Sequence, residues 1–432
     1  MVVRPLVLVP LLVAAAAAQP WDLPERAADS LSNAADKKLK LTFEQRGRYE
    51  SRTGNGFGAD PDYDTGLERI RLGLTWTPAK WIRFSGMLQD VRAPWYGVGA
   101  PNNLRDHADL QEGYIELFPG AKGFGMTVGR MMMNYGEARL IGAPQWASLA
   151  RTFDHARVYW RWQKAQLEFL LVSAVKARIT EFNRPVLGDR VWGTYNVFPD
   201  FYKKHQLDLY LLRHDQNRPG GFTGVGRLET HTGGFRLTGP VAAGIRYSLE
   251  AALQRGEVGV AKMRGGAGFA AISRRFTFIG RPLDLSVEYK YASGTANPAD
   301  STRTGTFDQM YPANHDKFGH ADLVGWRNIQ NARSLTSFGL TKSFTLNFMY
   351  DNYWLSHVKD ALYNGQGRAV ARSAAGTAGR HVGQELDLYG VYRYKHFTFG
   401  GGYGRFIPGE FIRNATRGLS PHYLYIFHTY SL

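Results

Sequence analysis

The sequence has no cysteine, few acidic residues and no long apolar run after its first 20 residues. Without cysteine, the chain contains no disulfide scaffold and no lipid-bearing N-terminal cysteine, and a chain of 432 residues is long enough to fold without either. Without eighteen consecutive apolar residues, it is predicted to form no membrane-spanning helix. Only 37 Asp and Glu oppose 53 Lys and Arg, giving a formal net charge of +16. Such a balance suits an anionic partner.

Familiar enzyme signatures are also missing. The chain contains no Gly-x-Ser-x-Gly, His-Glu-x-x-His, Walker A or dinucleotide-binding motif. We therefore predict that the protein is not an enzyme and binds no cofactor. Some outer-membrane barrels carry a Ser/His hydrolase at their rim, and this stays a distant alternative, although no Ser/His constellation supports it.

The first residues resemble a secretory signal. Arg4 precedes an apolar segment over residues 6–13, and an alanine run ends at Ala18. The segment is too short for a membrane anchor, which is the alternative interpretation. We predict a signal peptide over residues 1–18, cleaved after Ala18. Export removes the chain from nucleic acid, so the high positive charge is assigned to another polyanion.

Alternation of apolar and polar residues runs through most of the chain. "LDLSVEYKYA" (283–292) and "ERIRLGLTW" (68–76) each place apolar side chains on one face and polar ones on the other. This period of two predicts strands with one dry and one wet face. A glycine count of 49 and an aromatic content of 13% fit an all-β chain.

Short and long connections separate these strands in turn. Eight short links alternate with nine long ones, and the predicted long loops are 50–65, 91–107, 131–154, 175–189, 214–226, 255–265, 293–332, 355–383 and 405–421. This rhythm predicts an antiparallel transmembrane β-barrel of about 18 strands in the outer membrane, with short periplasmic turns and long extracellular loops. A secreted solenoid or adhesin sheet is the alternative, but no fixed repeat supports it.

The barrel is predicted over residues 39–432, after a periplasmic lead-in at 19–38. An 18-stranded barrel leaves an aqueous lumen, so its inward face can carry charge. In "ARVYWRW" (156–162), Trp160 and Trp162 share the lipid-facing side, and the arginines alternate with them. By the same alternation we predict inward-facing arginines at Arg46, Arg48, Arg69, Arg71, Arg83, Arg130, Arg157 and Arg161.

These arginines have two possible roles. Their planar forks can bind carboxylates of a passing solute, and an excess of basic residues favours anion selection. Alternatively they brace the wall through acids such as Glu44, Glu112, Glu116, Asp284 and Glu288. For a single arginine the sequence leaves both interpretations open. Lipopolysaccharide phosphates could bind some of the Lys and Arg residues at the outer rim.

The long loop at 293–332 draws attention because of its length and its polar cluster. A forty-residue connection is expected to cover or enter the lumen. It contains Asp308, His315, Asp316, His320 and Asp322. Their spacing matches no standard metal-binding loop, so we predict a polar loop without a functional metal.

Two stretches resemble the alginate export porin family. "GRMMMNYGEARLIGAPQWASLARTFDHARV" (129–158) carries the family's Gly-Arg, Arg-Leu-Ile-Gly and Arg-Thr-Phe-Asp elements. "YASGTANPADSTRTGTFDQMYPANHDKFGHADLVGWRNI" (291–329) carries Thr-Phe-Asp, Tyr-Pro and Asp-Leu-x-Gly-Trp. The barrel rhythm extends the resemblance over about 390 residues, although the chain ends in Leu432 where such barrels usually end in phenylalanine.

The resemblance implies an eighteen-stranded barrel that passes an anionic polysaccharide through an arginine-rich pore. It favours Arg130 and Arg157 and adds Arg139 and Arg151 to the candidate pore-lining set. We further expect outer-membrane lipid, lipopolysaccharide and periplasmic export proteins as partners, and no nucleic acid. A general anion-selective porin for small solutes fits the same residues and remains the alternative.

Overall fold

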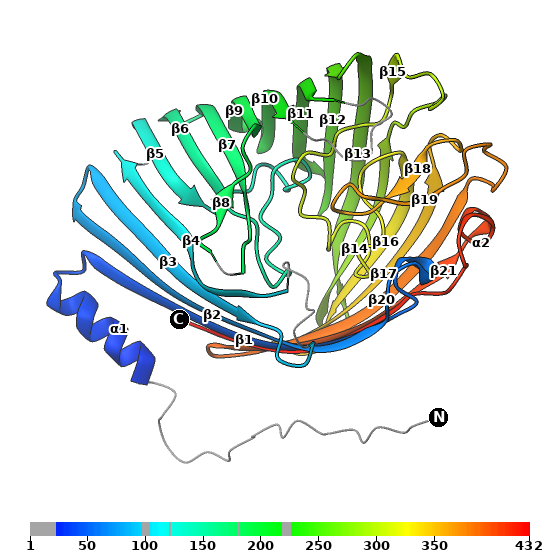
Figure 1. Ribbon diagram of the computed structural model, residues 1–432. Coiled ribbons are helices and arrows are strands. Elements are labelled where there is room, and N and C mark those ends of the chain that lie inside the picture. Colours follow the sequence, from blue (N-terminus) through cyan, green and yellow to red (C-terminus); the bar gives the residue numbers. More distant parts are fainter. Residues whose placement is uncertain (1–22, 97–103, 121, 180, 218–225, 243) are drawn as a thin grey trace.

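Residues 23–96, 104–120, 122–179, 181–217, 226–242 and 244–432 are described by a computed structural model, in which they build an antiparallel β-barrel (Figure 1). The predicted signal peptide at 1–18 lies outside the described residues. Each wall strand pairs with its neighbour, and the first strand pairs with the last from Glu44–Ser431 to Thr53–His422, which closes the barrel. Closure leaves no sheet edge in the membrane.

Eighteen wall strands are present among the described residues, as the alternation of short and long links predicted. They are β1 (Leu39–Thr53), β2 (Tyr63–Ala79), β3 (Ile82–Arg92), β4 (Asp106–Leu117), β5 (Gly123–Met131), β6 (Phe153–Trp162), β7 (Ala165–Lys176), β9 (Asp189–Tyr202), β10 (His205–Gln216), β11 (Leu228–Ala242), β12 (Ile245–Val258), β13 (Ala261–Phe278), β14 (Arg281–Ala292), β16 (Ile329–Gly339), β17 (Phe344–Leu355), β20 (His381–Tyr394), β21 (Phe397–Pro408) and β22 (His422–Ser431). Short strands β8 (Arg184–Pro185), β15 (Arg303–Thr304), β18 (Ala361–Tyr363) and β19 (Ala369–Arg372) lie in connections.

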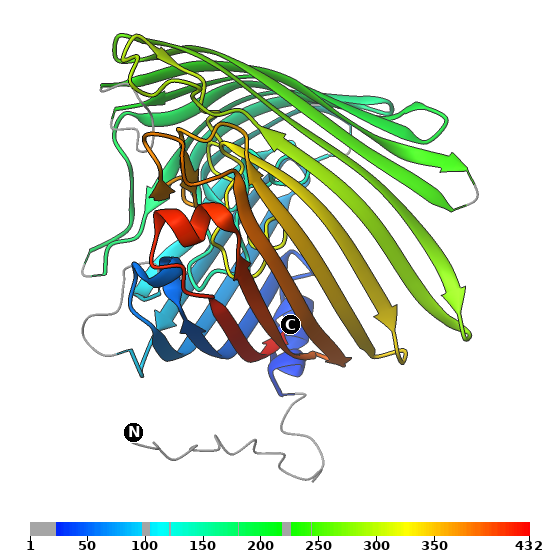
Figure 2. The same ribbon diagram turned by 90° about the vertical axis from the view of Figure 1, so that its right-hand side faces the viewer.

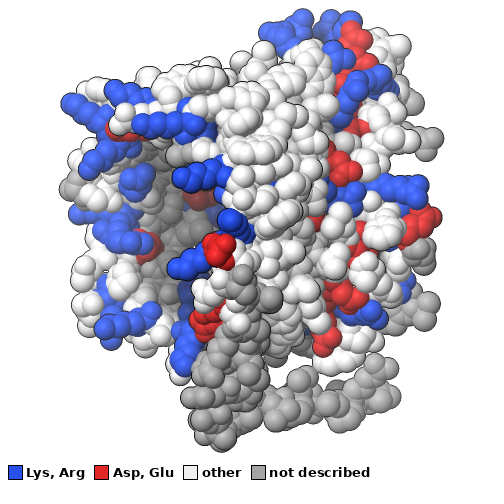
Figure 3. Space-filling model, turned by 90° about the vertical axis from the view of Figure 1, so that its left-hand side faces the viewer, with Lys and Arg blue, Asp and Glu red and all other residues white. Residues whose placement is uncertain are grey.

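Outward side chains form the apolar band that a lipid-facing wall requires. Leu72 on β2, Trp160 on β6 and Val287 on β14 are all more than half exposed, as the alternation predicts. Figure 3 shows a broad band of uncharged residues on this face. On one side of the band lies a zone of mixed charge, and on the other a hollow surrounded mainly by Lys and Arg. The inward residues of the same strands are buried or polar, so the two faces differ as membrane and lumen do.

Short turns gather at one end of the strands and long connections at the other (Figure 2). One predicted long loop, 255–265, is wrong. Strands β12 and β13 stay paired up to Val258 and Ala261, so only Gly259 and Val260 connect them. Gly259 has φ +58°, the left-handed conformation that tight hairpin turns need and glycine adopts without strain.

Helices are few and peripheral. Helix α1 (Leu23–Ala34) falls within the predicted lead-in, α2 (Glu410–Ala415) lies in the connection between β21 and β22, and the 3-10 turn η1 (Asn55–Gly58) follows β1. Within the described ranges, every helix is too short or too polar to cross a membrane.

Much of the buried apolar cluster lies inside the barrel, around two connections that turn inward (Figure 1). We call residues 132–152, between β5 and β6, the first inward loop, and residues 293–328, between β14 and β16, the second inward loop. Ile141 of the first and Tyr311 of the second form a parallel bridge. The predicted entry of the long loop into the lumen is therefore observed.

Candidate functional site: an arginine ladder inside the barrel

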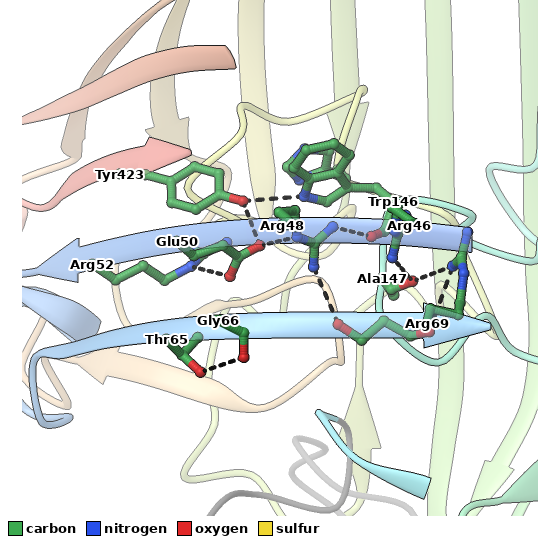
Figure 4. Close-up of polar contacts among 12 residues, drawn as sticks. Arg46, Arg48, Glu50, Arg52, Thr65, Gly66, Arg69, Trp146, Ala147 and Tyr423 are labelled. Atoms are coloured by element: carbon green, nitrogen blue, oxygen red, sulfur yellow. Dashed lines mark hydrogen bonds and ion pairs between the residues drawn. The ribbon is translucent and has the colours of Figure 1, made fainter. Parts of the chain in front are cut away.

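Four arginines on the inward faces of β1 and β2 hold the first inward loop. Arg46 donates to the carbonyl oxygens of Gln145 (2.9 Å) and Ala147 (3.0 Å), and Arg69 donates to the same two carbonyls (3.2 and 3.0 Å; Figure 4). Arg48 donates to the carbonyl of Trp146. Charge-assisted hydrogen bonds of this kind contribute about 1.5–3 kcal/mol each. The ladder Arg46, Arg48, Arg69 and Arg71 thus fixes the loop in the lumen.

The ladder keeps an excess of positive charge. Arg48 pairs with Glu50 (2.8 Å), and Arg69 pairs with Glu44 (2.7 Å), whereas Arg71 lies 3.8 Å from Glu44 and donates to Gln89 (2.7 Å). Two carboxylates therefore face four guanidinium groups, because the loop carbonyls that Arg46 binds are neutral. A low-dielectric, confined setting strengthens the field of such an uncompensated charge.

Trp146 sits at the centre of this contact. Its ring lies 4.3 Å from the Arg48 guanidinium carbon and stacks on His315 of the second inward loop at 4.9 Å. Its indole N–H donates to the Tyr423 hydroxyl (3.2 Å), which in turn donates to Glu50 (2.7 Å). One aromatic side chain therefore connects the ladder, the neighbouring strand β22 and both inward loops.

Arg151 and Arg139 belong to the first inward loop rather than to the wall. Arg151 donates to the carbonyls of Gly142 (3.0 Å) and Pro312 (3.1 Å), so it clasps the two inward loops together. Burial lowers the pKa of Arg151 to about 10. Arg139 is 4% exposed, contacts Glu250 at 3.0 Å, and lies over the Phe269 ring. Both are placed as structural braces.

Three other predicted arginines face the lumen from β3 and β6. Arg83 pairs with Glu116 at 2.9 Å and keeps 38% of its side chain exposed. Arg157 lies 3.7 Å from Glu168 and 5.5 Å from the Tyr159 ring centroid. Arg161 donates to Gln166 (2.8 Å) and lies 4.0 Å from the same ring centroid. These side chains extend the ladder toward the short-turn end of the barrel.

The predicted inward position of Arg130 is wrong. Arg130 stands opposite Asp154 in the register of β5 and β6, and both share the outward phase of Val128, which is 43% exposed. Arg130 binds Asp154 through two contacts (2.7 and 3.1 Å) and donates to the Asn183 carbonyl (2.9 Å). It therefore fastens the 177–188 connection to the outer wall and does not line the pore.

Several of the acids named as possible braces do pair with lumen cations. Asp284 pairs with Arg275 at 2.7 Å and Glu288 with Lys290 at 2.8 Å. Glu112 instead accepts the Met132 backbone N–H at 2.8 Å. The lumen arginines therefore brace the wall and still leave a net positive charge, because the cations outnumber the acids along the ladder.

Open lumen remains near the short-turn end. A cavity of about 450 Å³ is lined there by Arg275, Asp284, Asn347, Tyr389 and Arg393, among others. The sequence interpretation missed Arg275 and Arg393, although each continues the inward phase of its strand. It also missed Arg52, which extends the ladder and donates to the Ala321 carbonyl (2.9 Å), because a loop was expected from residue 50.

The polar residues of the second inward loop separate into groups: His315, His320 and Asp322 lie together, with the two imidazole rings stacked at 4.5 Å, whereas Asp308 and Asp316 have other partners. Asp308 contacts His214 (2.6 Å), Asp316 contacts Lys317 (2.8 Å) and His315 contacts Asp322 (3.0 Å). No group of three potential metal ligands converges among the described residues. The residues hold the loop in place, and absence of a functional metal stays an expectation.

Acid is expected to loosen the second inward loop. Burial tends to raise the pKa of Asp308 and of Asp322. His214 nevertheless holds the pKa of Asp308 below its ordinary range, and His315 and Arg52 do the same for Asp322. Such carboxyls stabilise the docked loop above an unfolded pKa near 3.9 and lose that effect as the pH falls through the folded pKa.

His320 also makes the docked second inward loop less stable in acid. Burial, and then the charge of His315, lowers the pKa of His320 well below its ordinary value, so His320 is neutral in the docked loop. Below a pH of about 6.5 an undocked His320 takes up a proton, and this destabilises the docked state. Single-channel recordings at pH 7.5, 5 and 3.5 should show rising conductance or flicker. A barrel lacking this loop should show no such change, and a conductance that falls in acid would contradict the assignment.

Comparison with known proteins places the fold. A family profile described as alginate export matches residues 37–425. No curated protein matches the chain. OpdO of Pseudomonas aeruginosa superimposes with a TM-score of 0.64 and 11% identity over 92% of this chain and 97% of its own. OpdQ of the same organism gives 0.64 and 10% over 92% and 98%. OpdK, solved with vanillate, gives 0.64 and 10% over 92% and 99%. At such identity the likeness establishes the barrel fold alone.

Proposed function

Because the chain belongs to the alginate export family, we propose that it passes an anionic, uronate-type polysaccharide across the outer membrane through an arginine-lined pore. The chain is an outer-membrane β-barrel channel, and its family and structural neighbours are channels rather than enzymes.

One observation carries the proposal: among the described residues, the four ladder arginines pair with two carboxylates, Glu44 and Glu50, and Glu50 is shared with a fifth inward arginine, Arg52. Uronate polymers bear one carboxylate per sugar, and a narrow, positively charged lumen raises the local concentration of such anions. The partly exposed Arg83, and Arg275 and Arg393 beside the open cavity, provide accessible cations further along the lumen. Contacts with exposed cations are weak, about 0–1 kcal/mol each, which lets a polymer release one site as it engages the next.

Passage of small carboxylates is the second candidate. It is favoured by the two inward loops, which occupy much of the lumen and meet at Ile141 and Tyr311. The structurally similar OpdK barrel was solved with vanillate, an aromatic carboxylate. A narrowed, positively charged path suits such solutes as well as an extended polymer chain.

Both candidates require an anion-selective pore, so selectivity is the first test. The purified protein in a planar bilayer separating unequal KCl solutions should give a reversal potential that favours chloride over potassium. The preference should weaken at high salt, where the Debye length falls to about 3 Å at 1 M. A cation-selective wild-type channel would exclude both candidates.

A further inference from the structure

A row of basic residues crosses the outer face of the barrel and is separate from the ladder, which lies inside. Arg213 on β10 stands opposite His231 on β11, His231 opposite Arg255 on β12, and Arg255 opposite Arg264 on β13. The four strands are consecutive in the wall (Figure 1). Each of the four residues lies three positions from the long-loop end of its strand, so the row follows the strand ends on that side of the barrel.

The row faces outward, directly beside the lipid-facing band. On β10 and β12 the next outward residues toward the membrane are Leu211 and Leu253, which are 60% and 73% exposed. His231, Arg255 and Arg264 are exposed too. Their level is therefore the boundary where lipid hydrocarbon gives way to headgroups on the long-loop, extracellular side.

Acids lie on the other side of the row, and one member of the row, Arg213, pairs with them together with Arg227 and Lys262. Arg213 pairs with Glu229 (2.7 Å) and Asp215 (2.9 Å), Arg227 with Glu229 (3.3 Å), and Lys262 with Glu257. Neither Arg255 nor Arg264 has a carboxylate partner anywhere in the described part of the chain.

The pairing of Arg255 with Arg264 is unfavourable in the protein alone. Two like charges directly opposite each other on one face of a sheet, with Cα atoms about 5 Å apart, destabilise the strand pair. The tight Gly259–Val260 turn fixes that register, so the two guanidinium groups cannot separate by a slip of the strands. An external anion would offset the repulsion.

The corresponding positions on other strands of the wall are uncharged. Three positions from the long-loop ends of β14, β16 and β17 lie the outward residues Tyr289, Ala332 and Asn352, which stand opposite one another. Aromatic and amide side chains are ordinary at a membrane interface. The basic row therefore does not continue onto these three strands.

We propose that Arg213, His231, Arg255 and Arg264 bind the phosphate groups of lipid A in the outer leaflet of the outer membrane. Lipopolysaccharide forms that leaflet, and its lipid A presents phosphates at the level of this row. Arginine forks bind phosphate through paired, charge-assisted hydrogen bonds. Acyl chains of the same lipid would lie against Leu211 and Leu253.

The test compares two double variants of the full-length barrel. R255Q/R264Q removes the two unpaired charges of the row. R274Q/R405Q is the matched control, because Arg274 and Arg405 are also outward and exposed but lie at the other end of β13 and on β21. Each detergent-solubilised protein is titrated with bisphosphoryl lipid A, dephosphorylated lipid A, phosphatidylglycerol and inorganic phosphate, and binding is followed by native mass spectrometry.

Bisphosphoryl lipid A should bind the wild type and the control alike, and R255Q/R264Q at least about tenfold more weakly, as loss of charge-assisted contacts implies. Dephosphorylated lipid A, phosphatidylglycerol and free phosphate should bind weakly to all three. Equal binding of bisphosphoryl and dephosphorylated lipid A, or an equal loss in both variants, would overturn the proposal. Channel current serves as the folding check and should be unchanged, so failure here is distinct from failure of the proposed transport.

Discussion

Excision of the second inward loop is expected to raise the single-channel conductance severalfold while the barrel still assembles. Residues 295–326 would be replaced by a short glycine–serine linker between β14 and β16. These strands pair directly from Leu283–Phe338 to Ala292–Ile329, so the wall does not depend on the loop. The excised segment includes Phe307, Phe318 and Trp326, which are buried, so its removal should widen the path open to ions.

A smaller truncation controls for effects of shortening the chain. Residues 297–301 form the exposed outer tip of the same connection, and their replacement should leave conductance unchanged. Heat-modifiable migration in electrophoresis reports barrel assembly for both variants. Wild-type conductance in a properly assembled excision variant would mean that the ion path does not pass this loop.

Charge reversal in the ladder is expected to have the largest effect on selectivity. R46E/R69E places two acids where the first inward loop needs donors, and it adds them to Glu44 and Glu50. The ladder then becomes negative overall. The chloride-to-potassium permeability ratio from reversal potentials should fall by about tenfold or more, since charged lumens concentrate ions by roughly 10–10³.

A second pair of variants separates selection from bracing. R46K/R69K keeps both charges but loses the planar forks that reach two carbonyls at once. It should retain chloride preference, with noisier current from a looser loop. R274E/R405E changes the same charge on the outer face and should leave selectivity as in the wild type. Loss of selectivity in the lysine variant would assign the arginines to bracing alone.

Much of the fold could be predicted because a membrane wall imposes strict alternation. Ile70, Leu72 and Leu74 alternate with Arg69, Arg71 and Gly73, and the exposed fractions follow that pattern. The outward position of Arg130 could also have been predicted from the sequence, because Arg130 lies on the same face of β5 as Phe124 and Val128. The turn at Gly259 was harder to predict, because polar and small residues on both sides of it resemble a loop.

The bracing contacts could not be predicted from residue types. Arg46 binds the Gln145 carbonyl, 99 positions away in the sequence, and Arg69 binds the Ala147 carbonyl, 78 positions away. Every residue offers such a carbonyl, so only the folded position of the first inward loop decides which ones are met. Likewise the contact of Arg151 with Pro312 depends on how two loops from separate hairpins meet.

Block of the ionic current by a polyuronate tests the account most directly. Wild-type channels in a planar bilayer would receive polymannuronate or neutral dextran of equal length, at the same monomer concentration and ionic strength. Polymannuronate should block the chloride current, while dextran should not, and R46E/R69E should lose the block, because the lumen cations bind carboxylates rather than sugar rings. Equal block by dextran and polymannuronate, or no block by either, would contradict passage of an anionic polysaccharide and leave small solutes as the cargo.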